Sequence, residues 1–161
     1  QEIGKWNIFP FYAFNVWAYD NCKKCPSIYK FLKNIKGLKL ATLSRMTPGL
    51  KLEEHQGWAI HSNYVIRCHF GIIVPKKCYI SVSDEYGTQK KFHKNNKWLI
   101  FDDSKNHYAH NDSNEDRIVL IVDVERPTNV SIGKSTVGDT SELMNIVNYF
   151  KNKNKFPTTT F

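Results

Sequence analysis

The stretch YVIRCHFGIIV, from Tyr64 to Val74, is rich in β-branched and aromatic residues and carries Arg67 and His69 two positions apart. Alternate residues of a strand point to the same face, so these two polar side chains share one side of a sheet. Four more runs of this kind lie along the chain, at 38–45, 78–83, 97–101 and 117–124. Pro, Gly and Asn turn signals separate them, which indicates an antiparallel sandwich or barrel.

Among such folds, the double-stranded β-helix, the jelly-roll arrangement of the cupins, fits this pattern best. We expect a mostly β protein with flanking N-terminal and C-terminal helices. Residues 1–37 form a mixed helical cover, with crowded aromatics from Trp6 to Tyr19 and a helix from Pro26 to about Asn34. Residues 38–127 form the β-helix core.

Residues 128–161 form a helical tail, in which Asp139 is a candidate N-cap with Glu142 three positions on. Its expected apolar face comprises Leu143, Ile146, Val147 and Phe150. A chain of 161 residues suits one domain, 1–161, with a sizeable core.

The formal charge is +8, but the lysines are spread along the chain and cluster in turns and in the tail. Without a basic helix or an aromatic RNA motif, this pattern argues against nucleic acid as a partner. No apolar run reaches the ~18 residues that span a bilayer. The chain starts at Gln1 without methionine, so its compartment stays open, with a soluble, cytoplasmic location favoured.

Cys22-Lys23-Lys24-Cys25 has the spacing of a redox pair or of half a zinc site. No second pair of this spacing accompanies it, so two ordinary thiols before a helix are favoured. Whether Cys22 and Cys25 pair is left open by the sequence. The segment Asn111-Asp112-Ser113 fits the glycosylation pattern, which matters only in a secreted protein.

His55-Gln56-Gly57 is followed, beyond the arginine-bearing strand, by Asp102-Asp103-Ser104 and His107. The common non-haem iron site uses two histidines and a carboxylate. The carboxylate usually lies two residues after the first histidine, and here that place holds Gly57. Together with Leu43-Ser44-Arg45-Met46-Thr47-Pro48-Gly49, Ile66 to Pro75 and Arg117 to Val124, in this order, the chain resembles the aspartyl/asparaginyl β-hydroxylases over residues 4 to 127.

The resemblance implies an Fe(II)- and 2-oxoglutarate-dependent dioxygenase that hydroxylates its substrate and releases succinate and CO₂. It makes His55 and His107 the iron ligands, with the remaining positions open to 2-oxoglutarate, water and O₂. It also places Asp103 beside the iron, where it hydrogen bonds a metal-bound water. Asp103 could equally be a turn residue that caps backbone N–H groups.

The resemblance also assigns the cosubstrate's carboxylates. Arg117, which begins a very apolar strand, and Ser44 match the residues that hold the distal carboxylate, and a guanidinium fork suits that role. Arg67 and His69 match those that hold the carboxylate nearest the metal. An exposed ion pair for Arg67 and a core position for His69 are the alternatives.

Two further positions, Trp6 and Met46, match residues near the substrate pocket, although core packing would also explain them. The other histidines, His61, His93 and His110, match no family position, and we expect them to be structural or surface residues.

Relatives act on aspartyl and asparaginyl residues of proteins, and others hydroxylate lipid acyl chains, so the substrate is a protein, a peptide or a small molecule. A lipid acyl-chain hydroxylase and a non-catalytic cupin-like binding module are the competing hypotheses. The retention of Ser44, Arg67, His69 and Arg117 together argues against the binding module. The sequence leaves the substrate, the stereochemistry and the oligomeric state open.

Overall fold

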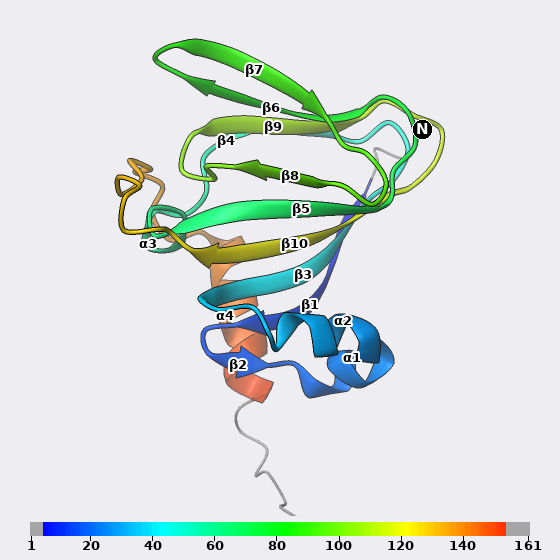
Figure 1. The fold of residues 1–161 in the computed structure, drawn as a ribbon, viewed down its shortest axis with the longest axis vertical. Coiled ribbons are helices and arrows are strands. Elements are labelled where there is room, and N and C mark those ends of the chain that lie inside the picture. Colours follow the sequence, from blue (N-terminus) through cyan, green and yellow to red (C-terminus); the bar gives the residue numbers. More distant parts are fainter. Residues whose placement is uncertain (1–4, 154–161) are drawn as a thin grey trace, which may run out of the picture.

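The fold is built from two antiparallel sheets that face each other across the core (Figure 1). It is seen in a computed structural model, which describes residues 5–153. The larger sheet has six strands in the order β2-β1-β3-β10-β5-β8, and the smaller has four in the order β4-β9-β6-β7. This arrangement confirms the predicted mostly β fold, a double-stranded β-helix with flanking helices.

The larger sheet comprises β1 (Trp6–Ala13), β2 (Val16–Trp17), β3 (Leu38–Met46), β5 (Val65–Ile73), β8 (Trp98–Phe101) and β10 (Arg117–Glu125). The smaller comprises β4 (Lys51–His55), β6 (Cys78–Asp84), β7 (Gly87–Phe92) and β9 (Asn106–Asn111). The helices are α1 (Tyr19–Lys24), α2 (Pro26–Leu32), α3 (Ala59–Ser62) and α4 (Ser141–Lys153).

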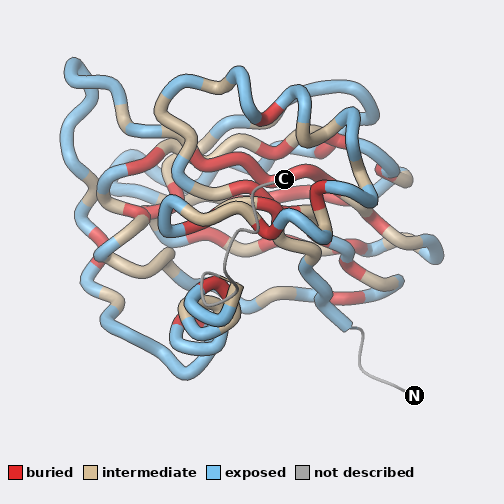
Figure 2. Tube along the Cα trace, turned by 90° about the horizontal axis from the view of Figure 1, so that it is seen from below, coloured by how far each residue is buried: buried red, intermediate tan, exposed pale blue. Residues whose placement is uncertain are grey.

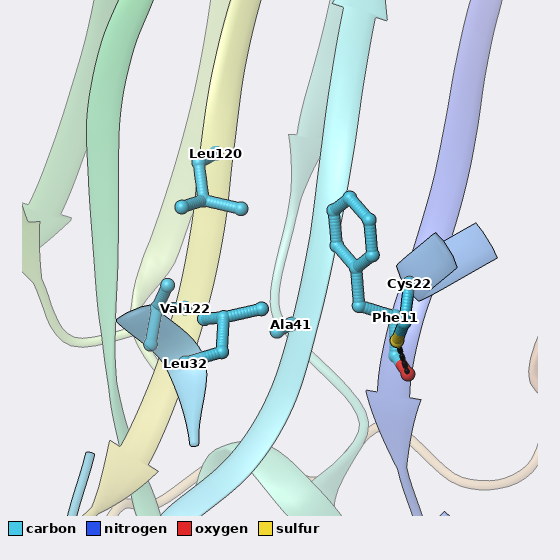
Figure 3. Packing of buried hydrophobic residues seen from close by; sticks show 6 residues of the cluster. All are labelled: Phe11, Cys22, Leu32, Ala41, Leu120 and Val122. Carbon is cyan, nitrogen blue, oxygen red and sulfur yellow. Dashed lines mark hydrogen bonds between the residues drawn. The ribbon is translucent and has the colours of Figure 1, made fainter. Parts of the chain in front are cut away.

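Because successive side chains of a strand point to opposite faces, the larger sheet has an apolar outer face and a polar inner face. Alternate residues of the central strands, including Ala41, Leu120 and Val122, pack with Phe11 and with Cys22 and Leu32 from α1 and α2 (Figure 3). The buried residues gather along the strands in the middle of the molecule (Figure 2). Ser44, Arg67, His69 and Arg117 occupy the intervening positions, which face the smaller sheet.

The segment from Trp6 to Ala13 is a strand of the larger sheet, not part of a cover as the sequence suggested. Pro10 and a bulge between Pro10 and Tyr12 interrupt its alternation, which hides the strand pattern. Within residues 5–37, the helical cover consists of α1 and α2. Cys22, within α1, and Cys25, directly before α2, are free thiols.

The C-terminal helix α4 packs against β1 and β2 through Ile146, Tyr149 and Phe150. Its cap is Thr140 and not Asp139, because the Thr140 hydroxyl accepts the backbone N–H of Leu143 at 3.2 Å. The helix thus begins one residue later than the predicted cap implies.

Asn111 is fully buried and ties the turn before β4 to the end of β9. Its amide donates to the carbonyl oxygens of Met46, Thr47 and Glu115 at 3.0, 3.1 and 2.8 Å. A side chain held in this way cannot carry a glycan in the folded protein. The glycosylation pattern at this position is therefore fortuitous.

Replacing Asn111 by Ala should lower the free energy of unfolding by roughly 3 kcal/mol, because buried carbonyl groups would lose their donor. Urea denaturation of the two proteins measures this loss. The exposed Asn129 offers a matched control, and N129A should change stability by less than about 0.5 kcal/mol. Equal stabilities of N111A and N129A would contradict the role assigned to Asn111.

Candidate metal and cosubstrate site

A cavity of about 640 Å³ lies between the two sheets and reaches α4. Most of the predicted site residues line it, namely Trp6, Ser44, His55, Arg67, His69, Asp103, His107 and Arg117. Met46 does not. It is fully buried in a cluster with Leu50 and Ala109, which is the core packing that the sequence analysis gave as the alternative to a place near the substrate pocket.

His55 at the end of β4 and His107 on β9 are paired in register, and their ring centroids lie 4.4 Å apart. Nδ1 of His55 donates to the Glu53 carbonyl at 2.7 Å, and Nδ1 of His107 donates to the Lys105 carbonyl at 2.8 Å. A carbonyl only accepts, so each Nδ1 carries the hydrogen and each Nε2 presents a lone pair. Two imidazoles held in this tautomer form a ready pair of metal ligands.

Gly57 leaves room for the carboxylate of Asp103. A Cβ atom at position 57 would lie 1.9 Å from Asp103 Oδ2, and the Gly57 N–H donates to the Asp103 carbonyl at 2.8 Å. Asp103 Oδ1 also lies 3.4 Å from Nε2 of His107. The carboxylate beside the histidine pair therefore comes from the β8–β9 loop, and any side chain at position 57 would displace it.

Arg67 is clamped between two buried carboxylates. Its Nε and Nη2 donate to Asp123 at 2.8 and 2.7 Å, and its Nη1 donates to Asp103. Burial alone would lower the pKa of Arg67, but the two aspartates raise it. Burial also raises the pKa of Asp103, whereas Arg67 holds the pKa of Asp123 below its ordinary range despite burial.

Arg117 is more deeply buried than Arg67 but has no carboxylate partner within residues 5–153. Its Nη2 donates to Ser44 Oγ at 3.0 Å, and its Nε finds no acceptor. Burial lowers the pKa of Arg117 to about 10, so the group is still charged at neutral pH. Because a buried charge is costly without a counter-ion, this guanidinium is suited to bind an anion in the cavity.

Ser44 prepares the same anion site. Its hydroxyl oxygen accepts from Trp6 Nε1 at 2.9 Å and from Arg117. Both acceptor positions of the oxygen are thus used, and the O–H is left to donate into the cavity. His69 adds a buried Nε2 without a partner on the same inner face.

Three residues of the site escaped the sequence analysis. Asp123 lies on β10, and His61 Nε2 lies 2.7 Å from its Oδ2, so His61 belongs to the Arg67 network and is not a surface histidine. His93 lies against His69. Asp123 had a readable signal, since it falls on the same face of its strand as Arg117. His61 lies in the short helix α3 and His93 in the loop after β7, and neither segment has a sequence pattern that indicates a site.

No cluster of three or more His, Cys, Asp and Glu side chains suited to a metal occurs in the described part of the chain. The donors at hand are the two imidazoles, so any metal here must complete its shell with ligands from outside the protein. The free Nε2 lone pairs fit Fe(II). Arg117, which has no carboxylate partner among the described residues, and the Ser44 hydroxyl fit a small dicarboxylate beside it.

The family model for aspartyl/asparaginyl β-hydroxylase matches residues 1–127. An ornithine lipid ester-linked acyl 2-hydroxylase of Rhizobium tropici is 36% identical over 126 residues, which cover 76% of this chain and 42% of that protein. The aspartate β-hydroxylase domain-containing protein 2 of Xenopus tropicalis is 37% identical over 135 residues, covering 77% of this chain and 34% of its own. The chain thus spans less than half the length of these relatives.

Solved structures show the same fold. An oxidoreductase of the 2OG-Fe(II) oxygenase family from Burkholderia pseudomallei superposes with a TM-score of 0.63. The match covers 83% of this chain and 73% of that one at 10% sequence identity. Such a likeness establishes the double-stranded β-helix and nothing finer.

The buried imidazoles should make the metal-free protein sensitive to mild acid. Burial lowers the pKa of His93 to about 3 and of His107 to about 4, and that of His69 well below its ordinary value. Below the unfolded pKa of about 6.5, the unfolded chain binds protons that the folded chain does not. Stability should thus be full above pH ~7 and fall between pH ~6.5 and 5, by at most ~1.4 kcal/mol per pH unit for each imidazole.

Urea midpoints measured from pH 7.5 to 5 test this dependence. The window lies above the range in which Asp123 titrates, but the raised pKa of Asp103 acts in the opposite direction, so the fall in stability reports the excess of the histidines over Asp103. A midpoint that stays constant or rises toward pH 5 would contradict a net effect of the buried imidazoles.

Proposed function

The chain belongs to the aspartyl/asparaginyl β-hydroxylase family, and we propose that it is an Fe(II)- and 2-oxoglutarate-dependent hydroxylase. The observation that carries this proposal is the buried, unpaired guanidinium of Arg117 in the same cavity as two imidazoles with free Nε2 atoms. A metal-binding module alone needs no buried cation without a counter-ion.

His55 and His107 would hold the iron through Nε2. Their Nδ1–H bonds to the Glu53 and Lys105 carbonyls set the ring orientations before a metal arrives. Asp103, fixed by Arg67, lies next to His107 and would accept a hydrogen bond from a water on the iron. Iron with bound 2-oxoglutarate and O₂ would supply the oxidation of an unactivated C–H bond, with succinate and CO₂ as coproducts.

Arg117 and Ser44 would bind the distal carboxylate of 2-oxoglutarate, and His69 the carboxylate nearer the iron. Arg67 was expected to bind that nearer carboxylate too, but its Nε and Nη2 are engaged by Asp123. We assign it the task of holding Asp103 in place, while its remaining N–H groups can still reach the cosubstrate.

The family makes an aspartyl or asparaginyl side chain the first candidate substrate. The walls of the cavity favour a second candidate, a lipid acyl chain. Away from the histidines they are largely apolar, formed by Ile8, Pro10, Tyr12, Leu40, Ile146 and Phe150. Arg67 and Arg117 are the only lysine or arginine side chains among the described residues of the lining.

Both arginines already have a role, so no cation is left to receive an acidic substrate side chain. Glu53 and Glu142 also line the cavity and would repel one. An acyl chain fits the apolar walls, and an acyl hydroxylase is one of the relatives. No helix within residues 5–153 has the length and apolar character to cross a membrane.

Arg117→Gln should weaken 2-oxoglutarate binding by at least about 100-fold, because a charged bidentate contact is lost. Calorimetry with Mn(II) in place of iron measures that binding, and the ligand-free variant should be no less stable than the parent, since a buried unpaired charge disappears. The exposed Arg45, paired with Asp116 at 2.8 Å, offers the control R45Q, which should bind normally.

Succinate release with Fe(II), ascorbate and air should accompany binding in the parent protein and vanish in H107A. The same assay separates the two substrates, because an acceptable substrate speeds succinate release. We expect an acyl lipid to raise the rate more than an aspartyl peptide. The reverse order would favour the aspartyl substrate. A parent protein that neither releases succinate nor binds 2-oxoglutarate would refute the oxygenase.

A further inference from the structure

His69 on β5 and His93, just after β7, form a buried pair of imidazoles. Their rings are stacked with centroids 5.3 Å apart and an interplanar angle of 14°, and Nδ1 of His69 lies 3.1 Å from Nε2 of His93. Both side chains are at least 94% buried. One hydrogen lies between the two nitrogens, so one ring donates and the other accepts.

His93 is held at this place by the segment that follows it. Its backbone N–H donates to the Cys78 carbonyl at 2.9 Å, and Asn95 bonds the backbone of Val74. The backbone of Lys94 passes so close to Gly71 that a Cβ atom there would lie 2.1 Å from the Lys94 carbonyl oxygen. Because Gly71 has no side chain, this segment can lie close to β5 and hold His93 in contact with His69.

The two outer nitrogens of the pair lie in different surroundings. His69 Nε2 and His93 Nδ1 are both buried and without a hydrogen-bond partner. His69 is part of the cavity lining, whereas His93 is not. An N–H on His93 Nδ1 would stay a buried unsatisfied donor, but an N–H on His69 Nε2 would face the cavity and could meet an acceptor.

We propose that His93 is a positioning residue that donates its Nε2–H to His69 Nδ1 and so fixes His69 in the tautomer that presents Nε2–H to the cavity. In this tautomer His69 can donate to an anionic oxygen. In the other it would turn a lone pair toward that oxygen and repel it. Naming the anion as a carboxylate of 2-oxoglutarate rests on the proposed function, but the tautomer does not.

Both rings are neutral around pH 7, in keeping with one shared hydrogen. Burial, foremost, and the charge of Arg117 lower the pKa of His93, and burial with His93 and Arg117 lowers that of His69. The nearby arginines Arg67 and Arg117 thus keep the pair from taking up a second proton.

Nitrogen-15 NMR of the imidazoles in the metal-free protein tests the assignment directly, because protonated and unprotonated ring nitrogens have well-separated shifts. We expect His69 to show a protonated Nε2 and an unprotonated Nδ1. His93→Leu, which removes the donor, should give a mixture of tautomers at His69. His93→Gln, whose amide can still donate, should retain the native pattern, and His110→Leu, whose ring contacts Tyr79 and Tyr108 and neither imidazole of the pair, should leave it unchanged.

Calorimetry with Mn(II) and 2-oxoglutarate supplies the second readout. H93L should weaken cosubstrate binding about tenfold, the loss of one hydrogen bond, without changing Mn(II) affinity, and H93Q should restore it. A protonated Nδ1 on His69 in the parent, or an unchanged His69 pattern in both H93L and H93Q, would overturn the proposal. If the parent binds no 2-oxoglutarate, the proposed function fails, and the nitrogen shifts still decide the role of His93.

Discussion

The guanidinium of Arg67, clamped by Asp103 and Asp123, holds the site together. Asp123 belongs to the strand beside β5, while Asp103 belongs to the loop that leads into β9 and its histidine. One side chain thus links the larger sheet to the strand that carries His107. Removing it would leave two carboxylates buried without a counter-ion, which costs several kcal/mol.

The second buried arginine shows the opposite condition. Arg67 has its carboxylates within the protein, whereas Arg117, although more deeply buried, has a hydroxyl and no acid among residues 5–153. This unequal pairing distinguishes an arginine whose charge is balanced within the protein from one whose charge is left for an anion to balance. The free energy spent on burying Arg117 is recovered when an anion binds, which is how a site gains affinity for a charged small molecule.

The histidine pair depends on what surrounds it rather than on a third protein ligand. Backbone carbonyls fix both tautomers, and the bare backbone at Gly57 admits the Asp103 carboxylate. Because position 57 is a glycine, the carboxylate beside the histidine pair comes from Asp103 in the β8–β9 loop, and Arg67 orients it. The His69–His93 pair follows the same logic, since a second residue decides which nitrogen of the first faces the cavity.

The alternation of apolar and polar residues along the chain predicted a good part of the fold. It placed Arg67 and His69 on one face of their strand, and it identified the strand that begins at Arg117, so the inner face could be predicted. It missed β4, β7 and β9, because polar runs such as KLEEH and GTQKKF lack the apolar alternation that marks a strand. Only the tertiary structure brought His61 to Asp123 and His93 to His69, and removed Met46 from the cavity. Those contacts depend on register and loop path between distant segments, where local sequence carries no information about the partner.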